Sequence, residues 1–434
     1  MGFKQAQAYL DALGVDVMKS MRPSTARIEA IVEALDHPER AVPAIHITGT
    51  NGKTSTARIA SSLLTAAGLK VGTYTSPHLE SVRERIALDG ESVGEEVFGE
   101  VFDHLHKYLE FVQEDLGQQL TYFEVLTAMF FLWAADNVDA MVVEVGLGGR
   151  WDATNVIDAP VSVITNISLD HTSLMGSSRE GIAEEKAGII SPNGVVVTAE
   201  RTPDALGVIV REANERGAAV SAIDRDFTAT DNRVALGGRY LSVETGGTPY
   251  KGMFLPLHGS HQGLNAATAV DAVARFLGAR PLGDEVVRDG LAAVRMPGRI
   301  EVLRPPGSAA PVVLDVAHNP DGMSALISSL VEAFAFDHVR FVVGILADKD
   351  YRGMLSELAR TPCSLTVTRP ANARSIPVTE LAAAAGDLAL ECAVVQDVTE
   401  AVDSAVRAAS ATELVCVTGS HYVVGEARAH LGSD

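Results

Sequence analysis

Cysteine is scarce in this chain of 434 residues, which has Cys363, Cys392 and Cys416, all late in the sequence. Their odd number and their spacing predict neither a disulfide framework nor a cysteine-bound metal, and they suit a reducing compartment. The chain also lacks an apolar run of the roughly 18 residues that a membrane-spanning helix needs. Its first residues have the pattern of an amphipathic helix without the apolar core of a signal peptide. We therefore expect a cytoplasmic protein with no membrane partner.

Basic residues are also in short supply. The 35 lysines and arginines are outnumbered by 56 aspartates and glutamates, which gives a formal net charge of −21. This charge argues against a general nucleic-acid surface, so an anionic ligand must be held by locally focused positive charge. Aromatic residues make up 5% of the chain and hydrophobic residues 47%, a balance that fits α/β cores built from Val, Ile, Leu and Ala.

The sequence is organised around the stretch AIHITGTNGKTSTARI, residues 44–59. An apolar strand, Ala44–Ile47, precedes the turn Gly49–Thr54 and a helix-compatible segment, an arrangement in which backbone N–H groups, the helix dipole and Lys53 attract phosphate. The hydroxyl of Thr54 would face a Mg²⁺ that bridges the phosphates of a nucleotide. The general P-loop pattern places a glycine where this chain has Ile47, so the motif is a shortened variant. The alternative is an ordinary strand-to-helix turn with a surface lysine.

Strand-like and helix-like segments alternate along most of the chain. The alternation runs to about residue 223, short strands with Gly-Gly turns occupy about 228–257, and two helices follow. Met296–Arg299 interrupts the pattern and is the candidate hinge. A second series of alternating segments then predicts another parallel-sheet domain. We therefore expect two α/β domains, residues 1–296 and residues 297–434.

Polar residues stand where buried strands are expected to end, which is where α/β proteins bind ligands. Glu144 interrupts the apolar strand MVVEV. It is either a Mg²⁺ ligand or water anchor, or one half of a structural salt bridge. The glycine-dense segment Gly146–Asn155 follows it as a candidate rim of the site. His171 is as often structural as catalytic, and Lys186, taken alone, is a solvated or capping residue.

Two further segments combine polar residues with a strand end or a helix start. Asn265 lies in the first turn of an alanine-rich helix, where it either contacts a base or caps the helix. Asp315 and His318 follow an apolar strand and suit acid–base chemistry or the orientation of a phosphate. A polar turn that caps the next helix is the alternative for this pair.

Taken together, these motifs resemble those of the folylpolyglutamate synthase/dihydrofolate synthase family, a branch of the Mur ligase superfamily. The Mur ligases proper usually carry an additional N-terminal domain for a UDP-sugar, for which residues 1–47 leave no room. The motifs that carry the resemblance are TGTNGKTS (Thr48–Ser55), TSPH (Thr75–His78), YFEVLTA (Tyr122–Ala128), VEVGLGGRWDATN (Val143–Asn155), SLDH (Ser168–His171), EKAGI (Glu185–Ile189), HGSHQGLNAA (His258–Ala267), PGR (Pro297–Arg299), DVAHNP (Asp315–Pro320) and GILADKD (Gly344–Asp350).

The resemblance implies an N-terminal P-loop ATPase domain of the Mur ligase type with a small β layer, followed by a Rossmann-like C-terminal α/β domain. Many members have Gly-Ser after the P-loop lysine where this chain has Thr54-Ser55, a change from which we expect no loss of activity. The implied ATP-binding residues are Gly49, Thr50, Asn51, Gly52, Lys53, Thr54, Ser55, Asn265, Arg299 and Asp315. The implied catalytic residues are Lys53, Lys186, Arg299, Asp315 and His318.

The same resemblance implies two Mg²⁺ sites and a pterin site. Lys186 falls where the family has a lysine that CO₂ converts to a carbamate, a carboxylate-like metal ligand. Phe123 falls where an aromatic ring lies near the pterin, and Pro77 and His78 would also face the folate. The implied metal ligands are Thr54, Ser76, Glu144, His171 and Lys186.

The implied activity is ATP-dependent ligation of L-glutamate to a folate carboxylate through an acyl phosphate. The substrates would be ATP, L-glutamate and a reduced folate, with dihydropteroate as a further acceptor, and the protein would act as a monomer without nucleic acid. One alternative is another Mur-type amino-acid ligase with a non-folate substrate. A second alternative is a P-loop ATPase switch that performs no ligation.

Overall fold

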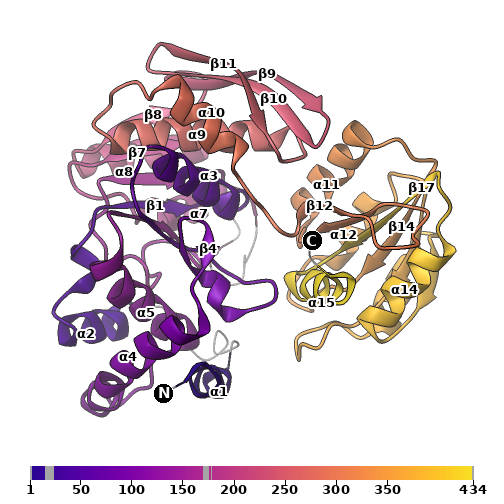
Figure 1. Ribbon diagram of the computed structural model, residues 1–434, viewed down its shortest axis with the longest axis horizontal. Coiled ribbons are helices and arrows are strands. Elements are labelled where there is room, and N and C mark those ends of the chain that lie inside the picture. Colours follow the sequence, from indigo (N-terminus) through magenta and orange to yellow (C-terminus); the bar gives the residue numbers. More distant parts are fainter. Residues whose placement is uncertain (1, 15–23, 170–174, 177, 433–434) are drawn as a thin grey trace.

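The computed structural model describes residues 2–14, 24–169, 175–176 and 178–432 (Figure 1). Within these residues the N-terminal part contains an eight-stranded sheet in which β2, β5, β1, β6, β7 and β8 run parallel. At one edge, β3 pairs antiparallel with β2, and β4 pairs antiparallel with β3. In spatial order the strands are β4 (Glu91–Ser92), β3 (Ile86–Leu88), β2 (Val71–Tyr74), β5 (Ala140–Glu144), β1 (Ala44–Thr48), β6 (Val161–Ile164), β7 (Val195–Thr198) and β8 (Ala219–Ala222).

The central strands are buried on both faces, which explains their nearly continuous apolar sequences. Side chains of β1 and β5 alternate between two cores, so that Ile45 and Val142 join one and Ala44 and Met141 join the other. The first core is covered by α3, α9 and α10, and the second by α1, α2, α4 and α5. The helices of this part are α1 (Phe3–Leu13), α2 (Ala26–Ala34), α3 (Lys53–Ala66), α4 (Glu95–Leu116), α5 (Tyr122–Asn137), α7 (Arg179–Ala187), α8 (Pro203–Glu215), α9 (His261–Phe276) and α10 (Asp284–Ala292).

A small antiparallel sheet of β9 (Phe227–Ala235), β10 (Gly238–Thr245) and β11 (Thr248–Leu255) lies at the top of the N-terminal part, against α9 and α10 (Figure 1). It is the β layer expected from the Gly-Gly turns. Tight turns at Gly237 and at Gly246–Gly247 adopt positive φ, which glycine tolerates without steric cost.

The C-terminal part is built on a six-stranded sheet of the described residues, which is parallel as expected except for an antiparallel strand at one edge. Arg299, expected in a hinge, begins β12, which runs antiparallel to β13. The strand is short and has a bulge between Arg299 and Glu301. Because it directly follows Pro297-Gly298, the sequence pattern predicted a turn here and not a strand. In spatial order the strands are β12 (Arg299–Leu303), β13 (Val312–Asp315), β17 (Glu413–Thr418), β14 (His338–Val343), β15 (Cys363–Val367) and β16 (Glu391–Val394).

Helices cover both faces of this second sheet, as in a doubly wound α/β fold (Figure 1). They are α11 (Pro320–Ala333), α12 (Tyr351–Leu358), α13 (Val378–Asp387), α14 (Val398–Ala408) and α15 (His421–Leu431). The predicted fold class is therefore confirmed, with a mixed sheet in place of a parallel one in the C-terminal part. No helix among the described residues is both long enough and apolar enough to cross a membrane.

Candidate active site

The turn between β1 and α3, hereafter the phosphate loop (Gly49–Thr54), wraps around the side chain of Lys53. The ammonium of Lys53 donates to the carbonyl oxygens of Gly49 at 3.1 Å and Thr50 at 3.2 Å. Gly52 precedes α3 with φ +83°, and a Cβ there would lie 2.6 Å from the amide oxygen of Asn265. The loop therefore needs glycine for both its backbone and its close contacts, and it directs a helix N-terminus and one ammonium toward a single point.

A buried carboxylate lies beside this loop at the end of β5. Glu144, 1% exposed, accepts from the Thr54 hydroxyl at 2.8 Å and from the backbone N–H of Ser76 at 3.2 Å. Burial raises the pKa of Glu144, while the charge of Lys53 and these hydrogen bonds act in the opposite direction. A carboxylate and a hydroxyl next to a phosphate loop are the oxygen donors that Mg²⁺ prefers, so the residues present fit the predicted metal.

Lys186 reaches the same loop from α7. It is 3% exposed, and its ammonium donates to the carbonyl oxygen of Gly49 at 3.0 Å. Three residues expected at the site from distant parts of the sequence, Lys53, Glu144 and Lys186, thus surround one turn. His171, the remaining predicted metal ligand, lies outside the described residues.

A cavity of about 380 Å³ opens in front of the phosphate loop and is lined by both parts of the molecule. Four predicted site residues that the structure describes lie outside its lining: Ser55, His78, Asn265 and Asp315. The predicted site residues that line it are Gly49, Thr50, Asn51, Gly52, Lys53, Thr54, Ser76, Pro77, Phe123, Glu144, Lys186, Arg299 and His318.

The predicted residues outside the lining make other contacts. Ser55 is buried within α3, and the Asn265 amide donates to Gln262 at 2.9 Å next to the phosphate loop. His78 accepts from Arg85 at 3.0 Å, and burial together with that guanidinium lowers its pKa to about 4.

Asp315 organises the edge of the C-terminal part that faces the cavity. Its carboxylate accepts from the backbone N–H of Ile300 at 3.0 Å and of Ala317 at 2.9 Å. Burial raises the pKa of Asp315, and the positive charge of Arg299 opposes that shift. Since Asp315 fixes the backbone beside Arg299 and His318, its contacts favour a supporting role over direct contact with a substrate.

The cavity also contains residues that the site prediction did not include. They come from both parts of the molecule, and those of the C-terminal part lie on segments far apart in the sequence, one of which is the GILADKD motif. Burial, with the charges of His318 and Arg299 next in size, lowers the pKa of His421 well below its usual value, so this imidazole is neutral. These additional lining residues include Arg85, Tyr122, Trp151, Asp348, Lys349, Arg374, His421 and Tyr422.

Lysine and arginine outnumber aspartate and glutamate in this lining, in contrast to the −21 charge of the chain. Basic side chains in a concave, partly desolvated site focus positive potential where anions enter. Arg299 contributes from the C-terminal part, and its charge acts on the carboxylates of both Glu144 and Asp315. The arrangement suits a reaction that brings several anionic groups together.

Comparisons with known proteins identify relatives with this architecture. A family model described as the Mur ligase middle domain matches residues 47–273, and one described as the Mur ligase glutamate ligase domain matches residues 298–421. A dihydrofolate synthase/folylpolyglutamate synthase of Mycobacterium tuberculosis is 40% identical over 445 residues, which cover 95% of this chain and 91% of that protein.

Solved structures are similar over nearly the whole chain. Mycobacterium tuberculosis folylpolyglutamate synthase complexed with ADP matches with a TM-score of 0.93 at 38% identity, covering 100% of this chain and 98% of that one. A bifunctional folylpolyglutamate synthase/dihydrofolate synthase with Mn, AMPPNP and L-glutamate bound matches with a TM-score of 0.84 at 30% identity, covering 99% and 98%.

Proposed function

The chain belongs to the Mur ligase family, in its dihydrofolate synthase/folylpolyglutamate synthase branch, and from this premise we propose how its cavity performs the reaction. The protein is an ATP-dependent, amide-forming ligase that joins L-glutamate to a folate. The observation that carries the assignment of roles is the buried Glu144 carboxylate, held by Thr54 of the phosphate loop in a cavity that both parts of the molecule line.

In the first step the folate carboxylate attacks the γ-phosphate of ATP, forming an acyl phosphate and releasing ADP. Two anions must approach each other, so positive charge at the point of transfer lowers the barrier. Lys53 supplies one such charge within the phosphate loop, and Arg299 supplies another from the C-terminal part. The backbone N–H groups at the start of α3 hold the remaining phosphate oxygens.

Glu144, Thr54 and Ser76 are the residues that would hold Mg²⁺ beside the phosphates. Bound there, the ion neutralises charge on the phosphate oxygens. We place a second ion at Glu144 together with His171 and a carbamylated Lys186. The support for this second site is the burial of Lys186 and its approach to Gly49, next to the loop that binds phosphate.

In the second step the amine of L-glutamate attacks the acyl phosphate, an amide forms, and phosphate leaves. Water would hydrolyse the acyl phosphate, so residues 1–296 and 297–434 are proposed to act as two domains that close around it. A contact already crosses this gap, since the Asn319 amide donates to Asn51 of the phosphate loop at 3.3 Å. His318, whose ring contacts the Val316 carbonyl at 3.0 Å, is held at the facing edge.

For the pteridine we propose both reduced folates and dihydropteroate as acceptors, with Phe123 and Pro77 of the cavity wall beside the ring. His78, the residue after Pro77, is proposed as a further folate-binding residue. We further propose a cytoplasmic monomer. The experiment is incubation with MgATP, L-glutamate and either 7,8-dihydropteroate or tetrahydrofolate, followed by mass spectrometry. One glutamyl unit gained on dihydropteroate and a ladder of units on tetrahydrofolate are the expected products. If neither pteridine gives a product and ADP is released with another carboxylate, the proposed folate substrate is wrong.

The carbamate at Lys186 makes a prediction of its own. Lys186→Ala should lose ligation because a carboxylate-like group disappears from the site, and high acetate should restore part of it. The measurement is product formation with and without acetate, with chloride at equal ionic strength as the control. Wild-type turnover in Lys186→Ala without acetate would refute the carbamate.

A further inference from the structure

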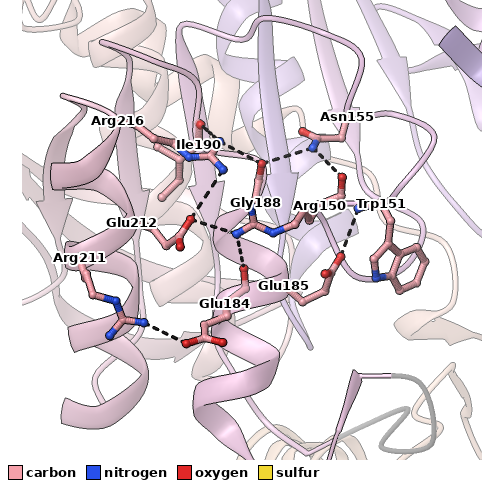
Figure 2. Close-up of polar contacts among 10 residues, drawn as sticks. All are labelled: Arg150, Trp151, Asn155, Glu184, Glu185, Gly188, Ile190, Arg211, Glu212 and Arg216. Atoms are coloured by element: carbon pink, nitrogen blue, oxygen red, sulfur yellow. Dashed lines mark hydrogen bonds and ion pairs between the residues drawn. The ribbon is translucent and has the colours of Figure 1, made fainter. Parts of the chain in front are cut away.

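The C-terminal end of α7 docks against the loop that follows β5, here called the glycine loop (Gly146–Trp151). The last carbonyl groups of a helix have no partner within the helix and need donors from elsewhere. Figure 2 shows that two side chains on the glycine-loop side supply them: Arg150 donates to the carbonyl of Glu184 at 3.3 Å, and Asn155 donates to the carbonyl of Gly188 at 3.3 Å. The backbone N–H of Arg150 adds a bond to the carbonyl of Glu185 at 2.9 Å.

The helix also supplies an acceptor to the loop. One carboxylate oxygen of Glu185 accepts from the backbone N–H of Gly149 at 3.1 Å and from that of Trp151 at 3.3 Å (Figure 2). The adjacent Glu184 differs in its contact, because its carboxylate pairs with Arg211 at 3.0 Å and is 56% exposed. Two neighbouring glutamates thus provide one carboxylate that holds the glycine loop and one that lies at the surface.

The contact between loop and helix is as close as backbone atoms allow. A Cβ at Gly149 would lie 2.7 Å from the carbonyl oxygen of Glu185 and 2.9 Å from the Cα of Lys186. A Cβ at Gly148 would lie 2.9 Å from both the Glu185 carboxylate and the indole of Trp151. The position of the glycine loop therefore determines the position of the backbone that carries Lys186.

Both partners continue to the reaction site. The Thr48 hydroxyl, at the end of β1, donates to the carbonyl of Gly148 at 2.8 Å, and the Lys186 ammonium donates to the carbonyl of Gly49 at 3.0 Å. Trp151 and Lys186 both line the cavity. A continuous series of contacts therefore links Glu185 to the glycine loop, the glycine loop to β1, and the phosphate loop after β1 to Lys186, the residue next to Glu185.

We propose that Glu185 is a positioning residue for ligation: its carboxylate holds the glycine loop against α7 and thereby fixes Lys186 at the phosphate loop and Trp151 in the cavity wall. The proposal rests on the role of Lys186 given under the proposed function. Glu185 acts through two neutral N–H donors, so an acceptor oxygen is required and a negative charge is not. Glutamine offers that oxygen with the same side-chain length, whereas alanine does not.

The experiment compares Glu185→Ala, Glu185→Gln and the matched control Glu184→Ala in a steady-state ligation assay. Loss of a group that orients a reacting residue lowers activity about 10- to 100-fold. We expect a loss of this size in kcat for Glu185→Ala, a smaller change in KM for ATP, and a melting temperature close to wild type. Glu185→Gln should recover most of the turnover, and Glu184→Ala should match wild type.

A spectroscopic readout reports the loop directly. The chain has two tryptophans, and Trp133→Phe leaves Trp151 as the single emitter. In that background Glu185→Ala should increase quenching of Trp151 by acrylamide, whereas Glu185→Gln should not.

Three outcomes would overturn the proposal. One is wild-type kcat in Glu185→Ala while Lys186→Ala is inactive, which removes the role of Glu185 and leaves that of Lys186. Another is a lower kcat of Glu185→Ala that returns to the wild-type value when the assay is run at temperatures below the melting transition of the variant. Such a result would show that the substitution affects stability and not positioning. The third is wild-type turnover in Lys186→Ala, which removes the proposed role of Lys186 and with it the positioning of that residue by Glu185.

Discussion

Burial decides how the ionisable groups around the phosphate loop behave. Glu144 lies deep enough for its pKa to rise, and the nearby ammonium of Lys53 opposes that shift. Breaking such an arrangement by deleting the cation leaves a buried carboxylate without compensation, which is costly. The same ammonium holds the carbonyl groups of the loop that it belongs to. Lys53 is therefore expected both to bind the phosphates of the substrate and to hold the conformation of the phosphate loop.

Replacing Lys53 by alanine tests this dual role. Removing one preorganised donor from a developing anion costs about 10²- to 10³-fold in turnover, and we expect a loss of ADP formation at least this large in Lys53→Ala. The measurement is coupled ADP release with a folate and L-glutamate present. The exposed Lys107 on α4 provides the control, since Lys107→Ala should behave as wild type. Unchanged ADP release in Lys53→Ala would refute the phosphate assignment.

A buried histidine predicts how stability depends on pH. His46 on β1 contacts the Thr154 hydroxyl at 2.8 Å, and that hydroxyl already donates to Asp152 at 2.6 Å, so His46 must donate through Nε2. Burial lowers the pKa of His46 to about 3. The unfolded chain takes up this proton near pH 6.5 and the folded chain does not, so the free energy of unfolding decreases as pH falls from 6.5 toward 3.

His46→Gln should be less stable than wild type near neutral pH and should lack this part of the acid dependence. The difference in free energy of unfolding between wild type and His46→Gln should narrow by about 1.4 kcal/mol per pH unit below 6.5, and so by about 2.7 kcal/mol at pH 4.5. Urea unfolding curves at several pH values measure this difference. Parallel curves for the two proteins across this range would contradict the prediction.

The element that carries the site is α3, whose first turn contains Lys53 and Thr54. Its position depends on packing against α9 and α10, which share with it the core that contains Ile45 and Val142. Gly290 of α10 allows the closest of these approaches, since a Cβ there would lie 2.8 Å from the side chain and 2.9 Å from the Cα of Leu63. A contact to backbone cannot be relieved by a rotamer change.

Gly290→Ala should therefore destabilise the protein by about 1–3 kcal/mol, the usual cost of overpacking. Gly207 of α8 is the matched control, because it also lies within a helix and no described atom lies within 4 Å of a Cβ placed there. Gly207→Ala should be neutral or stabilising by up to about 1 kcal/mol. Melting temperatures of the two variants measure the difference. Equal effects would show that helix propensity, and not the α3–α10 contact, governs both positions.

At the scale of the whole molecule, ion pairs on two different pairs of elements join the N-terminal and C-terminal parts. Arg239 of β10, 1% exposed, pairs with Glu332 of α11 at 2.7 Å. Arg428 of α15 pairs with Glu80 of the N-terminal part and, at 2.9 Å, with Glu301 of β12. In the proposed reaction through a water-sensitive acyl phosphate, such contacts would hold the two parts together during turnover.

Arg428→Gln should weaken this connection while each part stays folded. A partly exposed ion pair contributes up to about 1 kcal/mol, so the closed arrangement should become up to about fivefold less favoured. We expect lower ligation turnover, more acyl phosphate lost to water, measured as ADP released per amide formed, and a larger radius of gyration in solution scattering. Arg407→Gln is the control, since Arg407 pairs with Asp403 within α14 at the surface. Tight coupling of ADP to amide in Arg428→Gln would contradict the prediction.

Much of the fold could be predicted from local patterns. The two helices expected after residue 257 are α9 and α10, and the apolar strands expected at Glu144 and before His318 are β5 and β13. The exception has a physical cause. β12 is a short edge strand after a Pro-Gly turn, where the sequence predicted a hinge. A short strand beside a turn leaves a weak periodic signal.

The sequence by itself determined the phosphate loop, the strand ends that carry Glu144 and Asp315, and the alternation that produces two α/β sheets. These follow from local rules, because glycine geometry, helix dipoles and side-chain periodicity act over a few residues. Only the tertiary structure decided which cations face the phosphate loop, that Lys349, Arg374 and His421 line the cavity, and that Glu185 supports Lys186 while Glu184 does not. Those relations depend on contacts between segments far apart in the chain, and burial and distance exist only once the chain has folded.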